Sequence, residues 1–234
     1  MRRVDRVLGY VLFFGSGFAA LVYQIVWQRL VVLFSGSDVH SASIIVAAFM
    51  TGLGCGSLAG AHVADRLTHV ASLAAFAAAE LAIAAFGLSS AYLYYEVLYQ
   101  RLGHLAATVE IRSATLFISL LWPTFFMGIS LPLLARALTT EIAAAAAVTG
   151  RLYACNAVGA AVGAFVATWL LLPAQGIEGT LRTIAFINAI VAAAALPLAC
   201  RLRAAPVRGI GRDRLAPLEP PTVIGERFGA WLLI

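Results

Sequence analysis

Residues 69–92 read HVASLAAFAAAELAIAAFGLSSAY, an apolar run interrupted by one charged side chain, that of Glu80. A membrane-spanning helix needs about 20 mainly apolar residues, and this run is long enough to be one. A carboxylate at the centre of a bilayer costs about 3 kcal/mol on insertion scales, so it has to face protein or water. Its helical neighbours Ala77, Ala84 and Gly87 are small and apolar. We therefore expect another helix to approach here and to supply the polar partner of Glu80.

The composition of the whole chain supports a membrane location. The chain has 234 residues, of which 62% are hydrophobic and 12% are charged. A soluble domain has about 25% charged residues, so this chain has too few to cover a surface in water. A disordered chain is also excluded, because disorder requires low hydrophobicity and high charge. The net charge of +5 requires no nucleic-acid partner, since membrane proteins collect arginine in their cytoplasmic loops.

The hydrophobic pattern predicts an all-α polytopic membrane helix bundle in residues 1–201. Six transmembrane helices are expected, at about 8–34, 41–64, 69–92, 113–138, 152–173 and 180–200. Residues 202–234 are predicted to be a cytoplasmic tail rich in arginine and proline, with a short apolar end at 228–234. Seven residues cannot cross a bilayer. We expect this end either to dock on the membrane or to be the start of a seventh span at which a shortened chain stops.

The distribution of arginine predicts the orientation of the chain. All 16 basic residues are arginine, and with the N-terminus inside, twelve fall on the cytoplasmic side and four on the other. This is a positive-inside bias. We expect a multi-pass protein of the bacterial cytoplasmic membrane with both termini in the cytoplasm.

Residues 93–112, between the third and fourth spans, are predicted to form an amphipathic helix lying on the outer membrane interface. One face of that helix is apolar and the other is polar, and tyrosines at 92, 95 and 99 are typical of the aromatic belt. A binding lid is the alternative. The apolar face comprises Tyr94, Leu98, Leu102 and Leu105, and the polar face Glu96, Gln100 and His104.

Two spans carry glycines at a spacing of four, which places them on one helical stripe. The second span has Gly52, Gly56 and Gly60, and the fifth has Gly159 and Gly163. Such stripes let a neighbouring backbone approach closely, so we predict helix packing there.

Glu80 is the strongest candidate for a functional residue, and two interpretations are open. It is either a cation or proton site, or a structural glutamate that holds helices together. For a cation site, the first span offers Tyr23, Gln24 and Trp27; Tyr23 and Trp27 share a helical face and could hold an organic cation by cation–π attraction. Anchoring of Trp27 at the membrane interface is the alternative.

Other polar residues in the spans have structural interpretations. Asn156 and Asn188 are expected to form hydrogen bonds between helices. Asp65, at the cytoplasmic end of the second span, is expected to pair with Arg136 or Arg151, which would form a clasp at that face.

No motif for catalysis is present in the sequence. It has no nucleophile elbow, no paired carboxylates and no metal-ligand spacing, and its soluble segments are too short for a catalytic domain. We therefore expect neither enzyme activity nor a cofactor or metal.

Six sequence motifs, spread over residues 10–200, resemble the membrane domain of polytopic spermidine-synthase-like bacterial proteins, described as fused transporter/spermidine synthases. The resemblance implies a multi-helix membrane domain joined to a cytoplasmic aminopropyltransferase-like domain, or followed by a second membrane half. The nucleotide loop and amine-binding acids of that catalytic domain are missing here, so its activity is not implied. The motifs are Ser16–Arg29 (SGFAALVYQIVWQR), Phe49–Ser57 (FMTGLGCGS), Ala64–Arg66 (ADR), Pro123–Leu134 (PTFFMGISLPLL), Gly150–Gly163 (GRLYACNAVGAAVG) and Leu172–Pro173.

Three functions are compatible with these features. The first is a module that binds or transports an organic cation such as a polyamine, centred on Glu80 with Tyr23, Trp27 and Gln24. The second is a structural subunit that packs against other membrane subunits or a second copy. The third is a membrane anchor for a separate soluble synthase that docks on the tail. In addition, six spans form two sets of three in inverted orientation, and the glycine stripes of the second and fifth spans agree with such a repeat.

Overall fold

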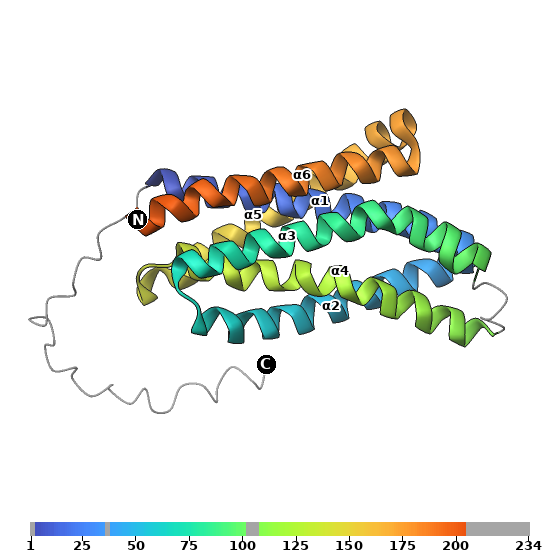
Figure 1. The fold of residues 1–234 in the computed structure, drawn as a ribbon, viewed down its shortest axis with the longest axis horizontal. Helices are drawn as coiled ribbons and strands as arrows, with labels where there is room; N and C mark the ends of the chain where they lie inside the picture. The colour runs from blue at the N-terminus through green and yellow to red at the C-terminus, as the bar shows by residue number, and fades with distance from the viewer. Residues whose placement is uncertain (1–2, 36–37, 102–107, 205–234) are drawn as a thin grey trace, which may run out of the picture. The chain divides into compact units, whose positions relative to one another are not determined.

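The computed structural model describes residues 3–35, 38–101 and 108–204, and within these ranges the chain is almost entirely helical, with no strand (Figure 1). The predicted all-α class is confirmed. The predicted tail, 202–234, lies outside the described residues from position 205 onwards. The elements are α1 (Arg3–Ser35), α2 (Asp38–Arg66), α3 (His69–Tyr92), the π-helical η1 (Leu93–Arg101), α4 (Val109–Leu138), the 3₁₀ turn η2 (Ile142–Ala144), α5 (Ala145–Val166), the π-helical η3 (Ala167–Leu171) and α6 (Leu172–Ala204).

The described residues contain five helical segments that are long and apolar enough to cross a membrane. The polytopic membrane architecture is supported to that extent, whereas six separate spans are not confirmed, because residues 145–201 form one continuous apolar segment. The segments are Val4–Val32, Ser41–Arg66, His69–Leu98, Glu110–Leu138 and Ala145–Arg201.

The last of these segments, at 57 residues, folds back on itself. Gly176 has φ 66° and ψ −169°, a left-handed conformation that glycine adopts without steric cost. On one side of it, Asn156 of α5 donates a hydrogen bond to the carbonyl oxygen of Phe13. On the other side, Val191 of α6 packs directly over Gly15. The chain before Gly176 and the chain after it therefore both pack beside the same turn of α1, so α5 and α6 are separate helices of the bundle.

The predicted interfacial helix is not confirmed. Residues 93–101 continue α3 as a π-helix, and Tyr94 and Leu98 are buried in a core cluster with residues of α1 and α4. The hydroxyl group of Tyr94 lies 2.9 Å from the Oγ atom of Ser119 in α4. This half of the predicted amphipathic face thus packs into the bundle. Leu102, His104 and Leu105 lie outside the described residues.

The helices pack in three main pairs, α2 with α4, α1 with α5 and α3 with α6 (Figure 1). The two glycine stripes form two of these contacts. Gly52, Gly56 and Gly60 lie against α4, and Gly159 and Gly163 lie against α1, in each case so closely that a Cβ atom would clash with the facing helix. Association of apolar helices in lipid depends on such close packing, because lipid chains are as apolar as leucine.

Candidate functional site

A layer of four buried polar side chains crosses the bundle around Glu80. Ser16 of α1 donates a hydrogen bond to Oε1 of Glu80 at 2.6 Å, and Asn188 of α6 donates from Nδ2 to Oε2 at 3.1 Å. The hydroxyl group of Ser130 in α4 lies 3.4 Å from Oε1 and also bonds to the carbonyl oxygen of Phe126 at 3.1 Å. The partners of Glu80 come from three other helices, as its apolar helical face predicted. We call Ser16, Glu80, Ser130 and Asn188 the polar layer.

The polar layer separates two hydrophobic clusters of the bundle. On α3, Phe76 belongs to one cluster and Ile83 to the other, with Glu80 between them. On α6, Ile184 and Val191 flank Asn188 in the same way. Glu80 has none of its surface exposed. A carboxyl group in this position requires hydrogen-bond donors from the protein, and the three neighbouring helices supply them.

Two polar atoms near the layer have no hydrogen-bond partner among the described residues. One is Oδ1 of Asn188 and the other is the hydroxyl group of Tyr23. The Tyr23 hydroxyl lies against Gly87 of α3, two helical turns from Glu80. A buried polar group without a partner costs about 1–3 kcal/mol, so both atoms are available for a further interaction.

A cavity of about 340 Å³ lies beside the layer, between α1, α2, α4 and α5. Pockets for small molecules range from about 300 to 1,000 Å³. We call it the central cavity. Ser16 belongs both to its wall and to the polar layer, so one hydroxyl group separates the cavity from Glu80. Its lining consists of Phe13, Ser16, Ala20, Leu21, Gln24, Phe49, Met50, Leu53, Ser57, Met127, Gly128, Leu131, Tyr153 and Asn156.

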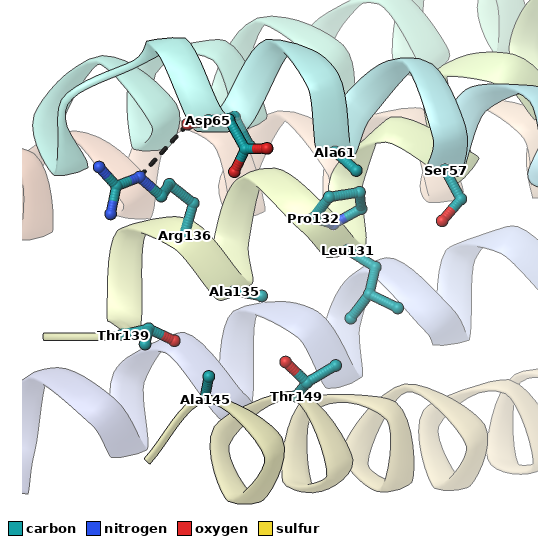
Figure 2. Close-up of a pocket in the computed structure, with 11 residues that line it drawn as sticks. Ser57, Ala61, Asp65, Leu131, Pro132, Ala135, Arg136, Thr139, Ala145 and Thr149 are labelled. Atoms are coloured by element: carbon teal, nitrogen blue, oxygen red, sulfur yellow. Dashed lines mark hydrogen bonds between the residues drawn. The ribbon is translucent and has the colours of Figure 1, made fainter. Parts of the chain in front are cut away.

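A second cavity, of about 370 Å³, adjoins the central cavity toward the end of the bundle where α2 and α4 finish. Ser57 and Leu131 line both cavities. Figure 2 shows side chains of α2, α4 and α5 around this second cavity, which we call the end cavity, with Asp65 and Arg136 at one end and Ser57 at the other. The two cavities therefore follow one another along the bundle, from its end toward Ser16 of the polar layer.

The ion pair predicted for Asp65 is not among the ion pairs that the described residues form. Nε of Arg136 instead donates to the carbonyl oxygen of Ala64 at 3.3 Å (Figure 2), because the last carbonyl groups of a helix have no partner within it. His69 of α3 bonds through Nδ1 to the carbonyl oxygen of Arg136 at 2.8 Å, and since a carbonyl accepts, Nδ1 carries the proton. Arg136 therefore joins α2, α3 and α4, whereas Arg151 is exposed.

The structure separates the residues that the sequence suggested for a cation site. Gln24 lines the central cavity, and Glu80 lies behind Ser16. Tyr23 and Trp27 are fully buried and stack on each other, with ring centroids 4.9 Å apart. Trp27 also donates from Nε1 to Oγ of Ser90 at 3.1 Å. With the rings in the core, neither residue lines the cavity, and Trp27 has no side-chain surface exposed for contact with an interface.

Sequence reasoning missed two members of the polar layer and every residue of the central cavity except Gln24. Ser16 and Ser130 are small hydroxyl residues within apolar runs, and such residues are common in membrane helices without any special role. Tyr153, in the cavity wall, lies in an apolar run of α5. The signal that could have led to the serines was the need of Glu80 for donors, but the sequence does not say which helices surround it.

The chain matches no protein-family model, and neither a curated protein nor a solved structure matches it. The resemblance to spermidine-synthase-like membrane domains therefore remains a prediction from the quoted motifs. Within residues 3–35, 38–101 and 108–204, no group of three histidine, cysteine or acidic side chains is placed to hold a metal ion.

Proposed function

We propose that this protein is a six-span membrane protein that binds a small organic cation in its central cavity. The observation that carries the proposal is the position of Ser16. Ser16 lines the cavity, and its hydroxyl group donates a hydrogen bond to the carboxyl group of Glu80. A negative charge on Glu80 would therefore attract a cation in the cavity, with only the side chain of Ser16 between them.

The six-span topology is supported by the directions of the helices. Phe14 and Phe18 of α1 lie against Gly159 and Gly163 of α5 in the same order, so these two helices run in the same direction. The start of α1 and the end of α6 belong to one hydrophobic cluster, which contains Leu12 and Leu198. An even number of crossings follows. Together with the arginine distribution, this supports the proposal that both ends lie in the cytoplasm of a bacterium, with the bundle in its inner membrane.

The chemistry of the central cavity favours a cation. None of the described residues that line it is basic. Oxygen atoms of Ser16, Gln24, Ser57 and Asn156 can accept hydrogen bonds from an ammonium group. Aromatic rings of Phe13, Phe49 and Tyr153 add surfaces suited to a cation and to methylene groups.

The motif resemblance narrows the chemical class of the proposed ligand. Proteins that resemble this chain in sequence motifs carry a domain related to polyamine synthesis, and a polyamine combines ammonium groups with methylene segments. We propose that this chain is a non-catalytic membrane module of that family. Its partners would be the lipid bilayer, other membrane subunits or a second copy, and a soluble synthase.

The proposal is tested by binding of spermidine and putrescine to the purified chain in lipid nanodiscs, measured by calorimetry. Glu80→Gln removes the charge and keeps the size of the side chain. We expect it to weaken binding about tenfold or more, which corresponds to about 1.4 kcal/mol of lost electrostatic attraction. Glu96→Gln is the matched control, because Glu96 pairs with the exposed Arg101 at 3.2 Å and lies away from the cavity. Equal binding by Glu80→Gln and the unchanged chain would refute the cation site.

The second candidate function is that of a structural subunit in a larger membrane assembly. The observation that favours it is that Glu80 is fully buried and accepts hydrogen bonds from three helices. Such a subunit should purify from native membranes with partners in fixed stoichiometry and should bind neither amine. Binding of an amine that depends on Glu80 would decide against this function.

A further inference from the structure

The contacts between helices have a two-fold pattern. Exchanging α1, α2 and α3 with α4, α5 and α6 turns the α2–α4 pair into the α5–α1 pair. The same exchange turns the α1–α6 contact into the α4–α3 contact and leaves the α3–α6 pair unchanged. All of these contacts are present in the bundle. The two sets of three helices are therefore packed in equivalent ways.

The equivalence extends to individual glycines of α2 and α5. A Cβ atom at Gly56 would clash with the carbonyl oxygen of Phe125 in α4, and one at Gly159 would clash with the carbonyl oxygen of Phe14 in α1. One turn further along, Gly60 lies against Ile129 of α4 in the way that Gly163 lies against Phe18 of α1. The same number of residues separates Gly56 from Gly159 and Gly60 from Gly163.

The reverse contacts obey the same correspondence. Gly128 of α4 lies against the carbonyl oxygen of Leu53, and Gly17 of α1 lies against the carbonyl oxygen of Asn156. The separation of Gly17 from Gly128 equals that of Phe14 from Phe125. The separation of Leu53 from Asn156 equals that of Gly56 from Gly159. One constant shift relates α1 to α4, and a second relates α2 to α5.

This correspondence pairs eight of the fourteen residues that line the central cavity with one another. In each of these four pairs, one residue lies in the first set of helices and the other lies in the second, and both line the cavity. The pseudo-two-fold axis therefore passes through the cavity. The pairs are Ser16 with Met127, Ala20 with Leu131, Met50 with Tyr153 and Leu53 with Asn156.

Each set contains three helices, so a chain that crosses the membrane at every helix places the second set upside down relative to the first. The axis then lies in the membrane plane and exchanges the two sides. Secondary transporters built from inverted repeats hold their substrate on such an axis and open it to either side as the repeats exchange conformations. We infer that this chain transports its ligand by alternating access through the central cavity, an inference that rests on the proposed function for the nature of the ligand.

The correspondence also predicts both routes to the central cavity. In the structure, the end cavity shares Ser57 and Leu131 with the central cavity and has Ala61 and Thr149 in its wall. The equivalents of Ala61 and Thr149 are Ala164 of α5 and Val46 of α2. The second route therefore runs between α1, α2 and α5, toward the end of the bundle opposite to the end cavity.

Thiol labelling from each side of the membrane tests the two routes. Cys55, Cys155 and Cys200 are replaced by alanine, and one cysteine is introduced per variant, at Ala61, Thr149, Ala164 or Val46. A membrane-impermeant maleimide is then applied to intact cells or to inverted vesicles. Because maleimide reacts with the thiolate, which needs water, a cysteine in lipid stays unlabelled. Ala85→Cys is the matched control, since Ala85 is exposed on α3 and lines neither cavity.

We expect labelling at positions 61 and 149 from the cytoplasmic side and at positions 164 and 46 from the outer side. In a further variant that carries cysteines at 61, 149 and 164 together, a bifunctional cross-link between 61 and 149 should hold the end cavity open and reduce outer labelling at 164 to the level of the control. Lack of outer labelling at both 164 and 46 would overturn the inference, as would outer labelling that the cross-link leaves unchanged. If the cross-link suppresses outer labelling as expected but neither spermidine nor putrescine binds, the proposed ligand is wrong and the transport route stands.

Discussion

Glu80 provides a matched pair of substitutions that separates the stability of the bundle from its binding. Glu80→Leu keeps the approximate volume of the side chain and removes both acceptor oxygens. Glu80→Gln keeps Oε1 as an acceptor for Ser16 and Ser130 and replaces Oε2 by an amide group. That amide would face Nδ2 of Asn188, and turning the Asn188 amide over would present Oδ1, which has no other partner among the described residues.

The structure predicts different losses of stability for the two variants. Glu80→Leu removes three hydrogen bonds between helices, which are worth about 0.6 kcal/mol each in a membrane protein, or about 2 kcal/mol together. It also leaves the donors of Ser16 and Asn188 buried without an acceptor, at about 1 kcal/mol or more for each. We expect a loss of about 2–4 kcal/mol for Glu80→Leu and of less than about 1 kcal/mol for Glu80→Gln.

The assay is equilibrium unfolding in mixed micelles, in which the fraction of sodium dodecyl sulfate is raised while the free energy of unfolding is followed by circular dichroism and tryptophan fluorescence. Both variants are compared with Glu96→Gln, which changes an exposed carboxylate. The reasoning is refuted if Glu80→Leu unfolds at the same point as the unchanged chain. Equal destabilisation by the two variants would show that the charge, and not the set of hydrogen bonds, stabilises the layer.

Further substitutions test the packing at other positions. Gly56→Val should lower the free energy of unfolding by about 1–3 kcal/mol, because α4 leaves no space for a side chain there. Gly54→Val should change it little, because a Cβ atom at Gly54 meets nothing within 4 Å, and equal effects of the two variants would contradict the assigned interface. Trp27→Phe should lower the free energy of unfolding by about 1 kcal/mol, because the buried hydrogen bond of Trp27 is lost. It should also remove a blue-shifted part of the tryptophan emission, and an unchanged spectrum would argue against a buried Trp27. Arg136→Gln should speed amide hydrogen exchange at the end of α2 by removing the bond to Ala64, and unchanged exchange there would show that this bond does not hold the helix end.

The extent to which the sequence predicted the fold can be seen in α3. Its apolar run and the need of Glu80 for a partner on another helix followed from residue types alone, because burial of a carboxyl group in lipid is so costly. The end of the same helix was predicted less well. The alternation of apolar and polar residues after Tyr92 is compatible with a helix on the membrane surface, yet Tyr94 and Leu98 pack into the bundle. An apolar face shows that something covers it, and lipid and protein cover it equally well.

The candidate site shows the same limit. Glu80 and Gln24 could be chosen from the sequence, since polar residues in apolar spans are few. Tyr23 and Trp27 share a helical face and were grouped with them on that ground, but the rings pack on each other in the core. Helical spacing predicts which side chains share a face, whereas the neighbouring helices decide whether that face lines a cavity.

By itself, the sequence determined that this chain is all-α with helices long and apolar enough to cross a membrane, that its second and fifth apolar segments pack through glycines, and that Glu80 lies among other helices. These features follow from local chemistry: hydrophobic length, residue size and the cost of a buried charge. Only the tertiary structure decided that Ser16, Ser130 and Asn188 surround Glu80, that a cavity lies behind Ser16, and that the two sets of three helices pack equivalently. Those features depend on which helices become neighbours, and that choice arises from the packing of the whole bundle.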